Sequence, residues 1–225
     1  DLRMSRGLGD VYKRQDLDGT LIDSLVDLAN TVNVILTEKG YPTHTLDEYR
    51  YFVGNGVLKL LERALPADHQ GDITAVKKRF DEIYGEICLE NTKPYPGITK
   101  LINTLADQGY NLAVVTNKPQ DHAVKIVKTL FPGCFKYIFG SSIRHPKKPD
   151  PCLTNLVINL FDVRKNEVVY IGDSDVDILT AKNTKVRSIG VSWGFRGRQE
   201  LLENGADLVV DHADEIKEAI NDWCK

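Results

Sequence analysis

The regular alternation of short apolar runs with amphipathic segments after Pro94 constrains the fold of this chain more than any other feature. Helical spacing of the apolar residues predicts helices at 97–109, 121–130, 151–161, 176–184 and 214–224. Between them, apolar and β-branched runs predict strands at 110–117, 137–141, 167–174, 186–192 and 206–211. Strands and helices that alternate in this way form a parallel sheet with helices on both faces.

The segment 24–92 interrupts this pattern, because it has no strand signal of similar quality. Amphipathic stretches there predict helices at 25–40, 56–66 and 73–91, and the sequence KPYPG at 93–97 marks the return to the core. We therefore predict an α/β chain in two parts. Residues 1–23 and 93–225 would form a Rossmann-like core, and residues 24–92 would form an inserted helical cap.

Charge and composition exclude several classes of partner. The net charge is −3 and no long basic run occurs, so nucleic-acid binding is not expected. No apolar stretch approaches the roughly 20 residues that span a bilayer, so no membrane partner is expected either. The four cysteines form no Cys-x-x-Cys pair and no signal peptide is evident, which favours a cytoplasmic location. A monomer and a homodimer are both open.

Polar side chains follow the predicted strands at their carboxyl ends, where open parallel sheets bind ligands. Asp16 and Asp18 follow the first strand, and Thr116, Asn117 and Lys118 follow the strand at 110–117. The remaining ends carry the sequence KKPDP at 147–151 and the sequence GDSDVD at 172–177. These segments are the candidate site.

The acidic residues of this candidate site need a cation. Asp16 and Asp18 are two residues apart in an extended segment and can reach the same side. Carboxylates held close together repel, and Asp173 and Asp177 increase the repulsion. A set of oxygen ligands favours Mg²⁺, and Lys148 is the candidate ammonium partner.

Such a site suits phosphoryl transfer. A carboxylate can attack phosphorus and form an aspartyl-phosphate, while Mg²⁺ and Lys148 neutralise the transferred group. The hydroxyl of Thr116 can bind a phosphoryl oxygen. A second acid is needed to protonate the leaving alcohol and later to deprotonate water.

Four segments resemble, in order and context, the motifs of the haloacid dehalogenase-like hydrolases, and are most similar to their phosphoglycolate phosphatase branch. The segments are DLDGTLIDS, VVTNKP, KPDP and YIGDSDVDILTAKNT. The resemblance implies that Asp16 is the nucleophile and Asp18 the acid/base, with both also binding Mg²⁺, Asp18 through its backbone carbonyl. It implies further that Thr116 and Lys148 hold the phosphoryl group.

The same resemblance assigns the remaining site residues. Asp173 would complete the metal site, and Asp177 would support it or orient Lys148. Asn117 lies near the substrate, and the cap would place a loop over it. Gly54, Asn55 and Gly56 would lie on that loop, although the two glycines could instead only begin a helix.

Alternatives remain at this stage. Lys147 rivals Lys148, and Asp175 rivals Asp177, although neither has the spacing of the family motif. The expected partner is a small phosphorylated metabolite, with 2-phosphoglycolate favoured. The alternatives are a pyrophosphatase, a β-phosphoglucomutase-like enzyme, or an inactive relative that serves as a binding or scaffold protein.

The residues before Asp16 do not fit a central strand. Such a strand is buried on both faces and should be apolar, but this chain has Lys13, Arg14 and Gln15 there. Buried unpaired charges are costly. We expect residues 1–15 to be non-native sequence, with a divergent native strand as the alternative.

Overall fold

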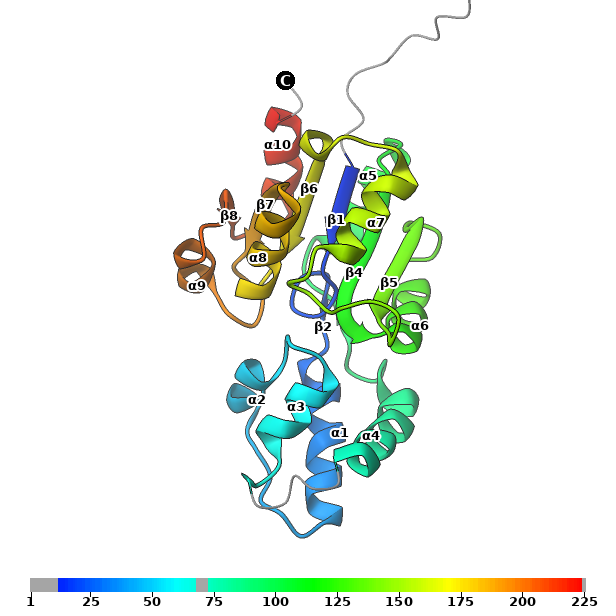
Figure 1. Ribbon diagram of the computed structural model, residues 1–225, viewed down its shortest axis with the longest axis vertical. Helices are drawn as coiled ribbons and strands as arrows, with labels where there is room; N and C mark the ends of the chain where they lie inside the picture. Colours follow the sequence, from blue (N-terminus) through cyan, green and yellow to red (C-terminus); the bar gives the residue numbers. More distant parts are fainter. Residues whose placement is uncertain (1–11, 68–72, 224–225) are drawn as a thin grey trace, which may run out of the picture.

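The computed structural model describes residues 12–67 and 73–223, with side chains from Gln15 onward (Figure 1). Its main sheet is wholly parallel, with the strand order β5-β4-β1-β6-β7-β8. The strands are β1 (Tyr12–Gln15), β4 (Leu112–Pro119), β5 (Tyr137–Ser141), β6 (Val168–Gly172), β7 (Arg187–Val191) and β8 (Leu208–Val210). The predicted parallel sheet is therefore confirmed.

Helices cover both faces of the sheet, as the alternation predicts. On one face, Leu112, Val114 and Ile171 belong to the same buried apolar cluster as α5 (Ile98–Asp107), α6 (Gln120–Leu130) and α10 (Ala213–Trp223). On the other face, Ala113 and Val115 pack with α7 (Cys152–Phe161) and α8 (Asp175–Thr184). The residues of β4 divide between two clusters because successive side chains of a strand point to opposite faces.

The inserted segment is a group of helices beyond the carboxyl ends of the strands (Figure 1). Its helices are α1 (Leu25–Glu38), α2 (Leu46–Phe52), α3 (Val57–Ala64) and α4 (Ile73–Ile87). We call this group the cap. The sequence analysis missed α2, which buries only Tyr49 and so has no clear apolar stripe, although its capping box at Thr45 and Glu48 is visible in the sequence.

Two linkers join the cap to the core. They pair as a short antiparallel sheet of β2 (Ile22–Asp23) and β3 (Lys93–Pro94). Beside it, the fully buried carboxylate of Asp27 accepts hydrogen bonds from the backbone and side chains of Asn91 and Thr92. This contact ties the start of α1 to the returning chain and fixes the base of the cap.

Several boundaries differ from the sequence predictions. β4 runs to Pro119 because Thr116, Asn117 and Lys118 continue the strand. The helix α9 (Arg198–Glu203) and the 3₁₀ turn at Lys165–Glu167 were not predicted. None of the described helices has both the length and the apolar character needed to cross a membrane.

The start of the chain bears on β1. Residues 1–11 and the side chains of 12–14 lie outside the described structure, so the expectation of non-native sequence there stays a prediction. Gln15 is described: it is buried, and neither polar atom of its amide has a hydrogen-bond partner among the described residues. A buried amide without partners is unfavourable, which agrees with the expectation that this position should be apolar.

Candidate active site

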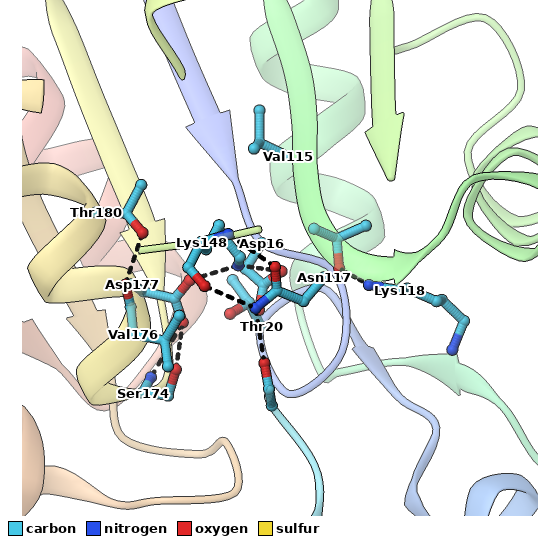
Figure 2. Close-up of polar contacts among 12 residues, drawn as sticks. Asp16, Thr20, Val115, Asn117, Lys118, Lys148, Ser174, Val176, Asp177 and Thr180 are labelled. Carbon is cyan, nitrogen blue, oxygen red and sulfur yellow. Dashed lines mark hydrogen bonds and ion pairs between the residues drawn. The ribbon is translucent and has the colours of Figure 1, made fainter. Parts of the chain in front are cut away.

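The predicted acidic residues meet at the carboxyl ends of β1 and β6, which are neighbours in the sheet (Figure 2). Asp16 directly follows β1, and its backbone N–H continues the ladder to Ile171. Asp173 follows β6, and Asp177 lies in the first turn of α8. One carboxylate oxygen from each of Asp16, Asp173 and Asp177 lies within 4.8 Å of the others.

Lys148 joins two of these carboxylates. Its Nζ lies 2.7 Å from Oδ1 of Asp16 and 2.7 Å from Oδ1 of Asp177, and all three side chains are almost fully buried. The neighbouring Lys147 lies elsewhere, with its Nζ next to Gly56 of the cap. The backbone of Lys148 is fixed by Asn117, whose Oδ1 accepts from its N–H and whose Nδ2 donates to its carbonyl.

Asp177 is held from both sides. Its Oδ2 accepts hydrogen bonds from the backbone N–H and the hydroxyl of Ser174, while Oδ1 faces Lys148. This leaves Asp177 well placed to orient Lys148. Asp175, the rival of Asp177, is half-buried at the start of α8 and lies outside the acidic cluster.

Asp173 sits in a narrow gap between two glycines. A Cβ at Gly19, which has φ +83°, would lie 2.3 Å from an oxygen of Asp173, and a Cβ at Gly194 would lie 2.2 Å from its Cβ. The carboxylate accepts from the hydroxyl of Thr20 and from the backbone N–H of Phe195. Glycine at these two positions therefore lets Asp173 approach Asp16.

The electrostatics of the cluster favour either a bound proton or a bound cation. Burial, together with the charge of Asp177 and against the opposing effect of Lys148, raises the pKa of Asp16 to about 7. Burial and the charges of Asp177 and Asp16 raise the pKa of Asp173 well above its ordinary value. A single ammonium, that of Lys148, does not balance three buried carboxylates. A divalent cation with oxygen ligands would balance them, so these residues fit Mg²⁺.

Asp18 lies outside this cluster but close to it. Its Oδ1 accepts a hydrogen bond from Ser24 and another from Nζ of Lys118 at 2.9 Å. Lys118 also donates to the hydroxyl of Tyr84, on cap helix α4, at 2.6 Å. Burial lowers the pKa of Lys118, but the nearby charge of Asp18 outweighs this effect and raises the pKa above its ordinary value. The ammonium of Lys118 therefore stays charged.

The remaining predicted residues divide into two groups. Thr116 is buried at the pocket and its hydroxyl accepts from the backbone N–H of Lys118. Gly54 and Gly56 also line the pocket. Asn55, in contrast, points its side-chain oxygen toward Arg63 and is absent from the pocket lining. Asn117 lines the pocket, but its amide is engaged with Lys148 and with the carbonyl of Gly54.

A pocket lies between core and cap and opens onto these groups. Its floor is polar, from Asp16, Asp18, Thr116, Asn117, Lys118, Asp173 and Ser174. Its roof is mainly apolar and comes from the cap, with Leu28, Val53, Val57, Leu60, Phe80 and Tyr84. The site therefore combines a charged reaction centre with a small, water-excluding cover.

Three contributors to the site were missed or left without a role by the sequence analysis. Lys118 was placed near the site, at the end of the strand predicted at 110–117, but was given no role. Arg196 donates to the carbonyls of Arg50 and Val53 at the end of α2, so it holds the cap against the core. The backbone of Phe195 carries no sequence signal, since any residue supplies an N–H.

The comparisons with known proteins agree with one another. Residues 15–191 match the model of the haloacid dehalogenase-like hydrolase family. A phosphoglycolate phosphatase of Pseudomonas syringae pv. tomato is 34% identical over 202 residues, covering 87% of this chain and 74% of the relative. A phosphoglycolate phosphatase of Vibrio parahaemolyticus is 32% identical over 215 residues, covering 91% and 93%.

A solved structure gives the same picture. The crystal structure of a candidate phosphoglycolate phosphatase from Lactobacillus delbrueckii subsp. bulgaricus has a TM-score of 0.87 and 31% identity. The match covers 95% of this chain and 99% of that one. The similarity thus extends over core and cap together.

Proposed function

The chain belongs to the haloacid dehalogenase-like hydrolases, and from this premise we propose that it is a Mg²⁺-dependent phosphatase that hydrolyses 2-phosphoglycolate through an aspartyl-phosphate. The observation that carries the proposal is the contact of Asp16 with Lys148, beside Asp173 and Asp177, with Asp16 and Asp173 on the floor of the pocket between core and cap. The names of the relatives support the substrate.

The reaction follows from the positions of two carboxylates. An oxygen of Asp16 attacks phosphorus, the bond from phosphorus to the ester oxygen breaks, and Asp18 gives its proton to the departing alcohol. Water then attacks the phosphorus of the aspartyl-phosphate and transfers a proton to Asp18. Inorganic phosphate leaves and the carboxylate of Asp16 is regenerated.

Lys148 and Thr116 hold the phosphoryl group during both steps. The ammonium of Lys148, already 2.7 Å from Asp16, is close enough to bind an oxygen of a group attached to Asp16. Thr116 offers its hydroxyl from the end of β4. Asp177 keeps Lys148 in place, because it binds the same Nζ at 2.7 Å.

Asp16, Asp173 and the backbone carbonyl of Asp18 would hold the metal, with Asp177 supporting them. When bound, Mg²⁺ would supply positive charge against the oxygens of the transferred phosphoryl group. Asp173 is pre-positioned for this by Phe195 and Thr20.

The roof of the pocket favours a small substrate. The residues that the cap contributes there are apolar apart from the hydroxyl of Tyr84 and the backbone at Gly54 and Gly56. A sugar phosphate carries several hydroxyls, each of which needs a hydrogen-bond partner when buried. This observation argues against a β-phosphoglucomutase-like substrate.

A substrate panel tests the proposal. The purified protein with Mg²⁺ is given 2-phosphoglycolate, glucose 6-phosphate, pyrophosphate and p-nitrophenyl phosphate, and phosphate release is measured. The proposal predicts the highest kcat/KM for 2-phosphoglycolate. A higher kcat/KM for pyrophosphate or for the sugar phosphate would contradict the assignment of 2-phosphoglycolate as the substrate. An absence of phosphate release from every compound would contradict the proposed phosphatase activity.

A further inference from the structure

We infer that Lys118 determines substrate specificity. Its ammonium binds the carboxylate of the substrate, so the pocket selects short phosphate esters in which one carbon separates the carboxylate from the ester oxygen. This inference rests on the proposed function and deepens it. The phosphoryl end of the substrate is accounted for by the groups around Asp16, whereas nothing in the preceding mechanism binds the other end.

The charge of the substrate requires a second cationic group. A carboxylate that enters a largely buried pocket loses water and must find a charged or polar partner there. Two cationic side chains occur among the described residues that line the pocket, Lys118 and Arg196. Of these, Arg196 donates to the carbonyls of Arg50, Tyr51 and Val53 at the end of α2, and is thereby committed to the cap.

Lys118 has a donor to spare. An ammonium has three N–H groups. Two of them are directed to Asp18 and Tyr84, and within the described part of the chain the third has no hydrogen-bond partner. The side chain is 2% exposed, so the group that occupies this donor must come from inside the pocket.

The position of Lys118 matches the length of the substrate. Asp18 must lie within hydrogen-bond reach of the ester oxygen to protonate it. In 2-phosphoglycolate a single methylene separates that oxygen from the carboxylate. A cation that binds the carboxylate of the substrate must therefore lie next to Asp18, the proposed acid. Nζ of Lys118 lies 2.9 Å from Oδ1 of Asp18.

Cap and core build this subsite together. Lys118 comes from β4 of the core, whereas Tyr84, which fixes its ammonium at 2.6 Å, comes from α4 of the cap. Figure 2 shows the Lys118 side chain leaving its strand on the side away from Lys148 and Asp177, so the two lysines serve different ends of the pocket.

A comparison of two substrates tests the inference. One is 2-phosphoglycolate, and the other is 2-hydroxyethyl phosphate, which has a neutral hydroxymethyl group in place of the carboxylate. For Lys118→Met, kcat/KM for 2-phosphoglycolate should fall roughly 10- to 100-fold more than kcat/KM for the neutral ester, as expected for a lost charge-assisted hydrogen bond. Lys118→Gln guards against misfolding of the Met variant, because it keeps a donor for Asp18 without the charge.

Lys128→Met is the matched control, since Lys128 is exposed on the neighbouring helix α6 and absent from the pocket lining. It should retain the preference of the wild type. An equal loss on both esters in the Lys118 variants would show that Lys118 only positions Asp18, and would overturn the inference while leaving the phosphatase intact. A wild type that prefers the neutral ester would instead overturn the proposed substrate, and the inference with it.

Discussion

The ammonium of Lys148 lies 2.7 Å from the carboxylate of Asp16, although the helical cap and the strands β4 and β5 separate them along the chain. The loop before α7 brings Lys148 to the end of β1, and Asn117 fixes the backbone of that loop. This ion pair places a permanent positive charge beside the group that we propose as the nucleophile. The predictions below follow from the surroundings of this pair.

Asp173→Asn should lower the affinity for Mg²⁺ while leaving the protein folded. The asparagine keeps the shape that fits between Gly19 and Gly194, but it removes one negative charge from the cluster. The Mg²⁺ concentration for half-maximal activity should rise at least roughly 10-fold. A Mg²⁺ titration of phosphate release checks this, and an unchanged midpoint would exclude Asp173 as a ligand.

Mg²⁺ should stabilise the protein more strongly at high pH than at low pH. The pKa of Asp16 is raised from 3.8 to about 7, so the metal-free folded protein holds a proton that the unfolded chain has lost. Stability from this residue is therefore present below the unfolded pKa and declines as the pH rises toward 7.

A bound cation replaces that proton. The increase in Tm on adding Mg²⁺ should be small near about pH 5 and larger near about pH 8. Thermal unfolding with Mg²⁺ or with EDTA at both pH values measures it. An increase in Tm that is the same at both pH values would contradict the proposed link between proton and metal.

Gln15→Leu should stabilise the protein. Gln15 is 1% exposed in a central strand, and both polar atoms of its amide lack hydrogen-bond partners within residues 12–67 and 73–223. Replacing it by an apolar side chain of similar size should raise the free energy of unfolding by about 1–3 kcal/mol. Urea unfolding checks this, and a loss of stability would indicate that the amide has an essential role in β1.

Gly56→Ala should impair activity. Gly56 has φ +86°, and an added Cβ would lie 2.8 Å from Nζ of Lys147 and 3.3 Å from the backbone oxygen of Asn117. Nζ of Lys147 can move away, but the backbone of Asn117 is less able to, so the cap loop should shift by a few tenths of an ångström at the pocket, and kcat/KM should fall several-fold. Gly40→Ala is the control, because φ is +71° there and no atom of the described residues lies within 4 Å of an added Cβ.

Both variants place a non-glycine residue at positive φ, and at Gly56, where ψ is +166°, the conformation is almost restricted to glycine and costs of order 1–3 kcal/mol. Both variants should therefore lose thermal stability, the Gly56 variant at least as much as the Gly40 variant, while only the Gly56 variant loses activity. Equal activity of the two would show that the loop does not cover the substrate.

The sequence allowed the parallel sheet and its helical layers to be predicted, because the apolar pattern of β4, β6 and their neighbouring helices reports burial directly. It also identified Asp16, Lys148, Asp173 and Asp177 as candidates, since they follow strands whose carboxyl ends must meet at one edge. The pairing of Lys118 with Asp18 and Tyr84 could not be predicted, because it depends on how α4 of the cap lies over the core. The hydrogen bonds from Arg196 to the carbonyls at the end of α2 depend on the same packing of cap and core.

The most direct test of the central claim is phosphate release from 2-phosphoglycolate by the wild type and by Asp16→Asn, each with Mg²⁺ and with EDTA. The asparagine keeps the size of the side chain but cannot act as the nucleophile, so kcat should fall by roughly four orders of magnitude or more. The account predicts release only from the wild type with Mg²⁺. Comparable release from a folded Asp16→Asn protein, or from the wild type in EDTA, would contradict it.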